Sequence, residues 1–292
     1  MNKLRIFIFL LLQAAISLAT NATQAATYVS NPAVNKLFYE GFQQLYHFKF
    51  NDCSAQASLL IKMYPGSPWG HILKAEHCWW MIISGDEQNH QGQVLTEELG
   101  KAMQLAETLP ERESLFCIII AYSLNSRYAL YKGQYVKAVE LLHTSSGLLK
   151  ASKREVETYE PFRLTQGLYE YFMAEAGKKF GIFNPLSIFG IDVSREKGLA
   201  LLEGLTTSDD EILRTESRYF LMKIYAEIEK EPAVAAKYGA MLVHEYPQNQ
   251  IFRYLYLDSA PEKKSQLPGI TLNSQLTEAQ QRYLQGLMKV KK

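Results

Sequence analysis

The sequence has few residues that break helices and no pattern typical of β-hairpins. It contains 17 glycines and 10 prolines in 292 residues, and no alternating apolar stretch closes on Asn-Gly or Asp-Gly. The long segments between these glycines and prolines carry apolar residues at helical spacing instead. The absences argue against a β-rich chain and predict an all-α fold.

An excess of either charge is also absent. The chain has 31 Lys and Arg residues against 30 Asp and Glu residues. Binding of nucleic acid requires a clustered positive excess, so we expect no nucleic-acid partner. Hydrophobic residues at 47% and charged residues at 21% are typical of an ordinary globular protein.

Motifs of common catalytic and cofactor sites are missing as well. The sequence has no nucleophile elbow, P-loop, dinucleotide fingerprint or zinc-binding helix motif. Neither CxxC nor a Cys/His metal spacing occurs, and His71 and His77, six residues apart, fall on different faces of one helix. We therefore expect no metal, no cofactor and no enzymatic activity.

Cysteines are few, and their number is odd. The three are Cys53, Cys78 and Cys117, and all lie in apolar helical runs, where thiols usually pack as small hydrophobic groups. One interpretation is therefore three packing residues. The other is a disulfide between Cys53 and Cys78, because their helices should be neighbours.

The N-terminus has the order of a secretory signal peptide. In "MNKLRIFIFLLLQAAISLATNATQA", Lys3 and Arg5 precede an apolar run, which small and polar residues follow. The run is shorter than the roughly 20 residues of a membrane span. We predict a signal peptide over 1–25, with cleavage after Ala25, or after Ala22 or Ala26. No cysteine forms a lipobox there, so we expect a periplasmic or secreted chain without a transmembrane span.

A helical hairpin recurs along the mature chain. In "VNKLFYEGFQQLYHFKFNDCSAQASLLIKMYP", Gly41 should let the partner helix come close, Phe50 should fill the turn, Cys53 takes a small-residue position and Pro65 ends the second helix. The same scheme appears twice more, first as Gly133, Tyr135 and Ala138, and then as Ala235 and Pro247.

With these residues the chain resembles the tetratricopeptide repeat superfamily, whose repeat is about 34 residues long, and within it exported bacterial members. The distal matches are Gly198, Leu199, Leu202, Tyr219, Phe220, Ile224, Tyr225, Ala235, Leu242, Tyr246, Pro247, Asn249 and Phe252. The resemblance covers most of 34–257. It implies a right-handed superhelical solenoid of about five hairpins over 26–257, followed by a linker and a C-terminal capping helix over 258–292.

The helical pattern predicts the bounds of these hairpins. The expected pairs are 34–47 with 52–64, 69–84 with 93–109, 111–132 with 135–150, 161–176 with 194–205, and 211–230 with 232–246. Ser208 and Glu211 have the spacing of a capping box, and so do Thr277 and Gln280 at the start of the final helix. A buried stripe is expected at Leu213, Ser217, Phe220, Leu221, Ile224 and Ile228.

Two segments are candidates for partner binding. In "HILKAEHCWW", Trp79 and Trp80 point about 100° apart, so one should enter the core and the other is available for the inner face of the hairpins. The insertion 178–190, with Phe183 and Phe189, is either a plug on the solenoid or a docking element for a partner or a membrane surface.

The function that these features favour is a non-catalytic scaffold of the bacterial periplasm or cell envelope, which binds a protein or peptide partner on its concave face. One alternative is a structural component of an envelope assembly, docked through 178–190. A second is a cell-wall-acting enzyme. That activity needs paired carboxylates facing a cleft, and the sequence pattern does not locate such a pair.

Overall fold

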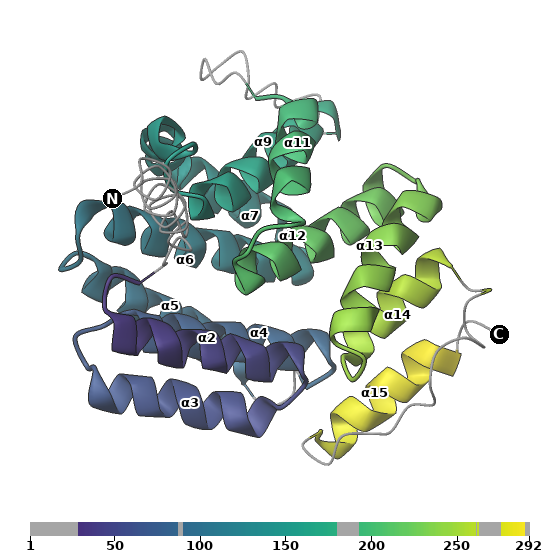
Figure 1. Cartoon of the computed structure of the whole chain (residues 1–292), viewed down its shortest axis with the longest axis horizontal. Helices are drawn as coiled ribbons and strands as arrows, with labels where there is room; N and C mark the ends of the chain where they lie inside the picture. Colours follow the sequence, from purple (N-terminus) through teal and green to yellow (C-terminus); the bar gives the residue numbers. More distant parts are fainter. Residues whose placement is uncertain (1–28, 87–89, 180–192, 261, 263–275, 290–292) are drawn as a thin grey trace, which may run out of the picture.

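The computed structural model describes residues 29–86, 90–179, 193–260, 262 and 276–289, and in these ranges it contains 13 α-helices and no strand (Figure 1). The prediction of an all-α chain is confirmed. The predicted signal peptide, residues 180–190 of the predicted insertion 178–190 with Phe183 and Phe189, and most of the predicted linker lie outside the described residues. No helix in the described ranges is long and apolar enough to cross a membrane.

The helices follow one another with short connections. They are α2 (Pro32–Tyr46), α3 (Phe50–Met63), α4 (Trp69–Ile83), α5 (Gln91–Ala106), α6 (Glu111–Tyr131), α7 (Tyr135–Thr144), α8 (Ser146–Ser152), α9 (Pro161–Lys179), α11 (Arg195–Leu205), α12 (Glu211–Lys223), α13 (Pro232–Glu245), α14 (Gln250–Ser259) and α15 (Glu278–Lys289). A π-helical turn over Ile224–Ile228 continues α12.

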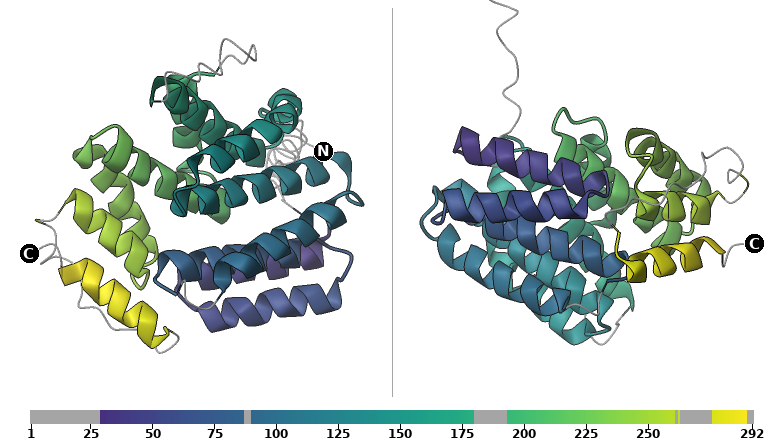
Figure 2. Two further views of the ribbon diagram at one scale, coloured as in Figure 1. Left: turned by 180° about the vertical axis from the view of Figure 1, so that it is seen from behind. Right: turned by 90° about the horizontal axis from the view of Figure 1, so that it is seen from below.

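The helices pack as sequential pairs in two layers. Each helix from α2 to α7 packs against the next, and the same holds for α9 with α11 and for α12 to α14. Contacts also join α2 to α4, α4 to α6, α6 to α9, α9 to α12 and α12 to α14. We call these six the inner helices, and the two views in Figure 2 show the other helices packed around them.

The two ends of the inner layer meet. The side-chain amide of Asn249 donates a hydrogen bond to the backbone oxygen of Tyr46 at 3.0 Å, and the rings of Tyr46 and Tyr246 lie 5.3 Å apart. Tyr39 on α2 donates a hydrogen bond to Asp210, which begins α12. The inner helices therefore surround the centre of the molecule instead of leaving an open arc.

Polar side chains fix several helix starts. Asp210 caps α12 by accepting from the backbone NH of Leu213 at 2.9 Å, so the predicted capping box of Ser208 and Glu211 is wrong. The box of Thr277 and Gln280 is confirmed by two reciprocal hydrogen bonds of 2.9 and 3.2 Å. Gln280 then donates to Ser84 at the end of α4, and so joins α15 to the first half of the chain.

Small residues occupy the helix crossings. A Cβ added at Gly198 would lie 2.6 Å from the backbone nitrogen of Tyr171, so α9 and α11 meet there. A Cβ at Gly41 would lie 2.2 Å from Leu73. Gly41 thus admits α4 rather than its hairpin partner α3, which corrects our expectation. The small-residue positions Cys53, Ala138 and Ala235 are all fully buried.

Other details differ from the sequence pattern. The predicted helix 135–150 is broken at Ser145 into α7 and α8, and α14 was not predicted at all. Helices α3 and α13 end two residues before Pro65 and Pro247, as expected from these prolines. The predicted stripe of α12 is buried up to Ile224, whereas Ile228 in the π-helical turn is exposed.

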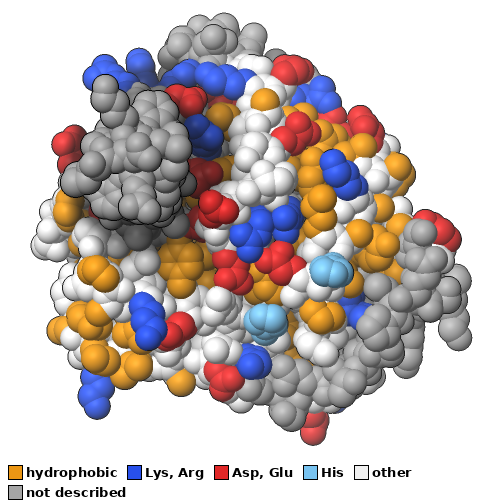
Figure 3. Space-filling view, viewed as in Figure 1, with side chains coloured by type: hydrophobic (Ala, Val, Ile, Leu, Met, Phe, Trp, Pro, Cys, Tyr) orange, Lys and Arg blue, Asp and Glu red, His pale blue; other side chains and the backbone are white. Residues whose placement is uncertain are grey.

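The surface mixes charges of both signs. On the face shown in Figure 3, acidic and basic side chains lie interspersed, without a broad area of one sign. Exposed apolar side chains collect where α6 turns into α7, at Leu130, Tyr131, Tyr135 and Val136. Tyr135 therefore does not fill its turn as predicted.

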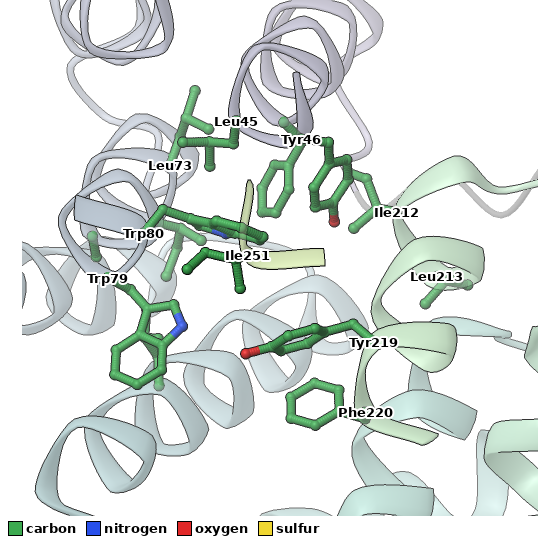
Figure 4. Close-up of a cluster of buried hydrophobic side chains, with 14 of the residues drawn as sticks. Leu45, Tyr46, Leu73, Trp79, Trp80, Ile212, Leu213, Tyr219, Phe220 and Ile251 are labelled. Carbon is green, nitrogen blue, oxygen red and sulfur yellow. The ribbon is translucent and has the colours of Figure 1, made fainter. Parts of the chain in front are cut away.

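Aromatic residues join the two halves of the chain in the core. Trp80 on α4 lies 6.2 Å from the ring of Tyr219 on α12 (Figure 4) and 5.6 Å from that of Phe252 on α14. The contact with Phe252 is edge-to-face, and contacts of this kind stabilise a core beyond the burial of their area. Trp80 is thus a tryptophan that enters the core, since only 1% of this residue is exposed, and its role in partner binding stays a prediction.

Candidate functional site

The inner helices line a cavity of about 80 Å³ that is partly open to solvent, and we call it the central cavity. Its wall takes residues from α2, α4, α6, α9 and α12, so it lies where the first and last parts of the chain meet. Phe38, Phe42, Phe116 and Phe220 supply aromatic surface, and aliphatic residues supply most of the remainder. Into this apolar wall are set three ionisable side chains, Glu76, Arg127 and Glu216.

The two carboxyl groups are deeply buried. Glu76 is 7% exposed and Glu216 is 8% exposed. Glu216 accepts a hydrogen bond of 3.0 Å from the hydroxyl of Tyr46, whereas Glu76 makes no hydrogen bond or ion pair with any described residue. Burial disfavours the charged form of both groups and raises the pKa of Glu76 to about 7; the pKa of Glu216 is also raised.

Arg127 is held by aromatic rings rather than by an acid. Its guanidinium carbon lies 5.0 Å from the ring of Trp79 and 4.9 Å from that of Phe220. Among the described residues it has no ion pair or hydrogen bond. Its charge still acts across the cavity, because it lowers the pKa of both carboxyl groups against the larger effect of burial.

The three charged side chains of the central cavity differ in how deeply they are buried. Glu76 and Glu216 are buried, while Arg127 is only half-buried, like its cavity-lining neighbour Ser123 on α6. The wall is also more exposed at Leu164 and Leu168 on α9. Glu76 on α4 and Glu216 on α12 are thus more deeply buried than Arg127 on α6.

This arrangement is suited to holding a small polar group. A volume of about 80 Å³ exceeds the roughly 10–15 Å³ that one water molecule needs, so the central cavity has room for several waters or for one end group of a larger ligand. Paired carboxylates also serve glycoside hydrolysis, in which they flank the scissile bond between two sugars.

A second buried acid belongs to a structural network outside the cavity. Glu98 on α5 contacts Nδ1 of His71 at 2.5 Å and also pairs with Lys74 and Lys101. Burial would raise the pKa of Glu98, but hydrogen bonds from His71 and Lys101 outweigh it and lower that pKa. Every partner of this carboxylate comes from α4 or α5, so the network joins these two helices. No cluster of His, Cys, Asp and Glu fit to hold a metal occurs among the described residues.

The other predicted site residues within the described ranges, Trp79 and the cysteines, are buried. Trp79 is buried and holds Arg127, so it contributes to the wall region through its ring, and its indole nitrogen has no hydrogen-bond partner among the described residues. The thiols of Cys53, Cys78 and Cys117 are buried and free in the structure. Burial raises the pKa of the Cys78 thiol to about 12, and pairing of Cys53 with Cys78 stays a prediction.

Sequence reasoning missed Glu76 and Glu216, although a signal for each was present. Glu76 lies four residues after the buried Ile72 on a helix that is otherwise apolar around it. Glu216 lies three residues after Leu213 and four before Phe220, within the predicted buried stripe. A carboxylate at a buried helical position needs a partner, and that requirement marks both residues.

A comparison of the chain with protein-family models gives no match, and comparisons with curated proteins and with solved structures give none either. The resemblance to tetratricopeptide repeats therefore rests on the residues quoted above and on the packing of sequential helix pairs.

Proposed function

We propose that this chain is a non-catalytic, exported helical-repeat protein that binds a protein or peptide partner on its inner helices, in the bacterial periplasm or cell envelope. Small residues at the helix crossings and pairwise packing support a solenoid of tetratricopeptide type. The order of charged, apolar and small residues in 1–25 supports export.

The observation that carries the proposal is the buried carboxyl group of Glu76. It lines the central cavity and forms no hydrogen bond or ion pair within the described chain. A buried carboxylate without a hydrogen-bond partner reduces stability, so its presence favours a binding role over a structural one. The cavity has room for an end group, so the partner would insert one side chain or one chain terminus.

Crosslinking from the cavity wall tests this proposal. A photoreactive phenylalanine analogue at Ser123, which lines the central cavity, should form a covalent product with a protein or peptide of the cell envelope. The same analogue at Ser58, an exposed position on α3, is the control. Equal labelling from both positions, or none from Ser123, would contradict the proposal.

A cell-wall-acting enzyme is a second candidate, favoured by the one cavity that holds both Glu76 and Glu216. Release of soluble fragments from purified cell wall by the mature chain, abolished by Glu216→Gln, would support the enzyme instead.

A further inference from the structure

The carboxyl group of Glu76 lacks a hydrogen-bond donor, and a ligand would supply one. Its side chain is more than nine-tenths buried, lines the central cavity and has no hydrogen-bond partner among the described residues. Glu216 across the cavity has one donor, the hydroxyl of Tyr46. A carboxylate can accept several hydrogen bonds, so both groups keep acceptor capacity toward the enclosed space.

The charge of the wall selects the sign of the ligand. When both glutamates are ionised, two negative charges face the single positive charge of Arg127. A ligand with one positive charge brings the cavity to neutrality, whereas an anion would be repelled by the two deeper groups. Arg127 is held by Trp79 and Phe220 and forms no ion pair with either glutamate, so both carboxylates remain available to a cation.

The remaining wall suits a compact cation with a short apolar stem. Phe38, Phe42 and Phe116 present rings to the same space, and aromatic faces attract cations. A primary ammonium offers three donors on one nitrogen, which matches two carboxylates better than a single-donor group does. The volume of about 80 Å³ accommodates this group with a few methylenes.

We propose that the central cavity binds a primary ammonium group of the partner between Glu76 and Glu216, with its stem passing Arg127 toward the exposed side. This inference rests on the proposed function and names the chemistry that the inner helices recognise. A lysine side chain and a peptide amino terminus both carry such a group.

The first experiment titrates the mature chain with n-propylammonium chloride and follows the indole NH resonance of Trp79 by NMR. Saturable shifts are expected with n-propylammonium and not with sodium propionate or N-propylacetamide at the same concentrations. Equal shifts with all three compounds, or no shift with n-propylammonium, would overturn the inference. This experiment uses the wild-type chain and so does not depend on the folding of a variant.

The second experiment compares matched variants. Glu76→Gln removes one carboxylate of the cavity and should weaken n-propylammonium binding by about tenfold or more. Glu97→Gln makes the same change at an exposed position of α5 and should leave binding unchanged. Equal binding by wild type and Glu76→Gln, with both folded by circular dichroism, would exclude Glu76 as the recognition group.

The third experiment separates the two sources of the ammonium. A lysine-free peptide with a free amino terminus is compared with an N-acetylated peptide that contains lysine, and a fully blocked peptide is the control. Binding of the lysine-free peptide assigns the ammonium to an amino terminus, and binding of the N-acetylated peptide assigns it to a lysine side chain. Binding of the blocked peptide, or of neither peptide with a free amine, would overturn the inference. Crosslinking from Ser123 without any ammonium binding would defeat only this inference, whereas ammonium binding without crosslinking would defeat only the proposed function.

Discussion

The first and third hairpins have the same pattern of small and aromatic residues, but they differ in whether other residues cover the aromatic side chain at the turn. Phe50, at the turn between α2 and α3, is 1% exposed because Phe48 and His77 pack against its ring. Tyr135, at the turn between α6 and α7, is 58% exposed. The small residues that follow, Cys53 and Ala138, are buried alike. A small residue is thus buried by the packing of its own hairpin. An aromatic residue at the turn is buried only where a neighbouring residue covers it.

The largest test of this comparison replaces the two aromatic residues. Phe50→Ala should lower the free energy of unfolding by about 3–5 kcal/mol, since it empties a packed site. Tyr135→Ala should change it by less than about 0.5 kcal/mol, because the side chain is mostly solvated. Urea denaturation of both variants measures the difference. Similar losses would mean that the turn of α7 is covered after all.

Two glycines on α11 sharpen the comparison at the small positions. Gly198→Ala should destabilise the chain by up to about 3 kcal/mol, because the new Cβ meets the backbone of α9. Gly204→Ala on the same helix meets no atom and should stabilise by roughly 0.5–1 kcal/mol through helix propensity. Opposite shifts in the urea midpoint are expected, and equal shifts would place the α9–α11 crossing elsewhere.

A third test compares a covered with an exposed carboxyl group. The pKa of Glu76 is raised to about 7 in the folded chain, above the ordinary value of about 4.3 for an unfolded one. Between these pH values the folded chain holds the extra proton, so this group makes stability fall as pH rises from about 4.5 to 7, with no further loss above 7. Glu76→Gln should remove a fall of about 3 kcal/mol.

Urea denaturation at pH 4.5, 6 and 8 measures this fall as the difference between wild type and variant. The lowered pKa values of Glu98 and Glu245 act in the opposite direction in both proteins and cancel in that difference. The exposed Glu97→Gln should retain the wild-type slope. An unchanged slope in Glu76→Gln would show that Glu76 is ionised throughout this range.

The smallest effect is expected at the C-terminal helix, which covers the end of α4. Thr277→Ala removes half of the capping box of α15 and should cost about 1 kcal/mol locally. Faster hydrogen exchange in α15 and at Ser84, with little change in α11, is the expected result. Uniform acceleration over the whole chain would contradict a local effect.

Sequence patterns predicted the features of the fold that depend on residues close together in the chain. The helices from α2 to α6 were found because their apolar residues repeat at helical spacing over many turns. Helix α14 was not predicted, because the expected hairpins end at 246. The break at Ser145 and the π-helical turn after Lys223 leave no clear mark in the sequence.

The candidate site depends on contacts that no local pattern contains. Tyr46 and Glu216 are 170 residues apart, and Tyr46 and Asn249 are 203 apart. The buried glutamates were readable as polar residues in apolar stripes, but their placement in one cavity follows only from the meeting of the first and last inner helices. The periodicity of apolar residues does not show which distant segments of the chain pack together.

That meeting of the ends also changes how the molecule should lose its structure. Linear arrays of repeats fray from their termini, and each repeat unfolds with an independence set by its nearest neighbours. Here the first inner helix is bonded to the last, through Tyr46 and Asn249, so neither terminus is free to melt first. We expect a single cooperative transition, in which the protection of α2 against hydrogen exchange equals that of α12 and α14.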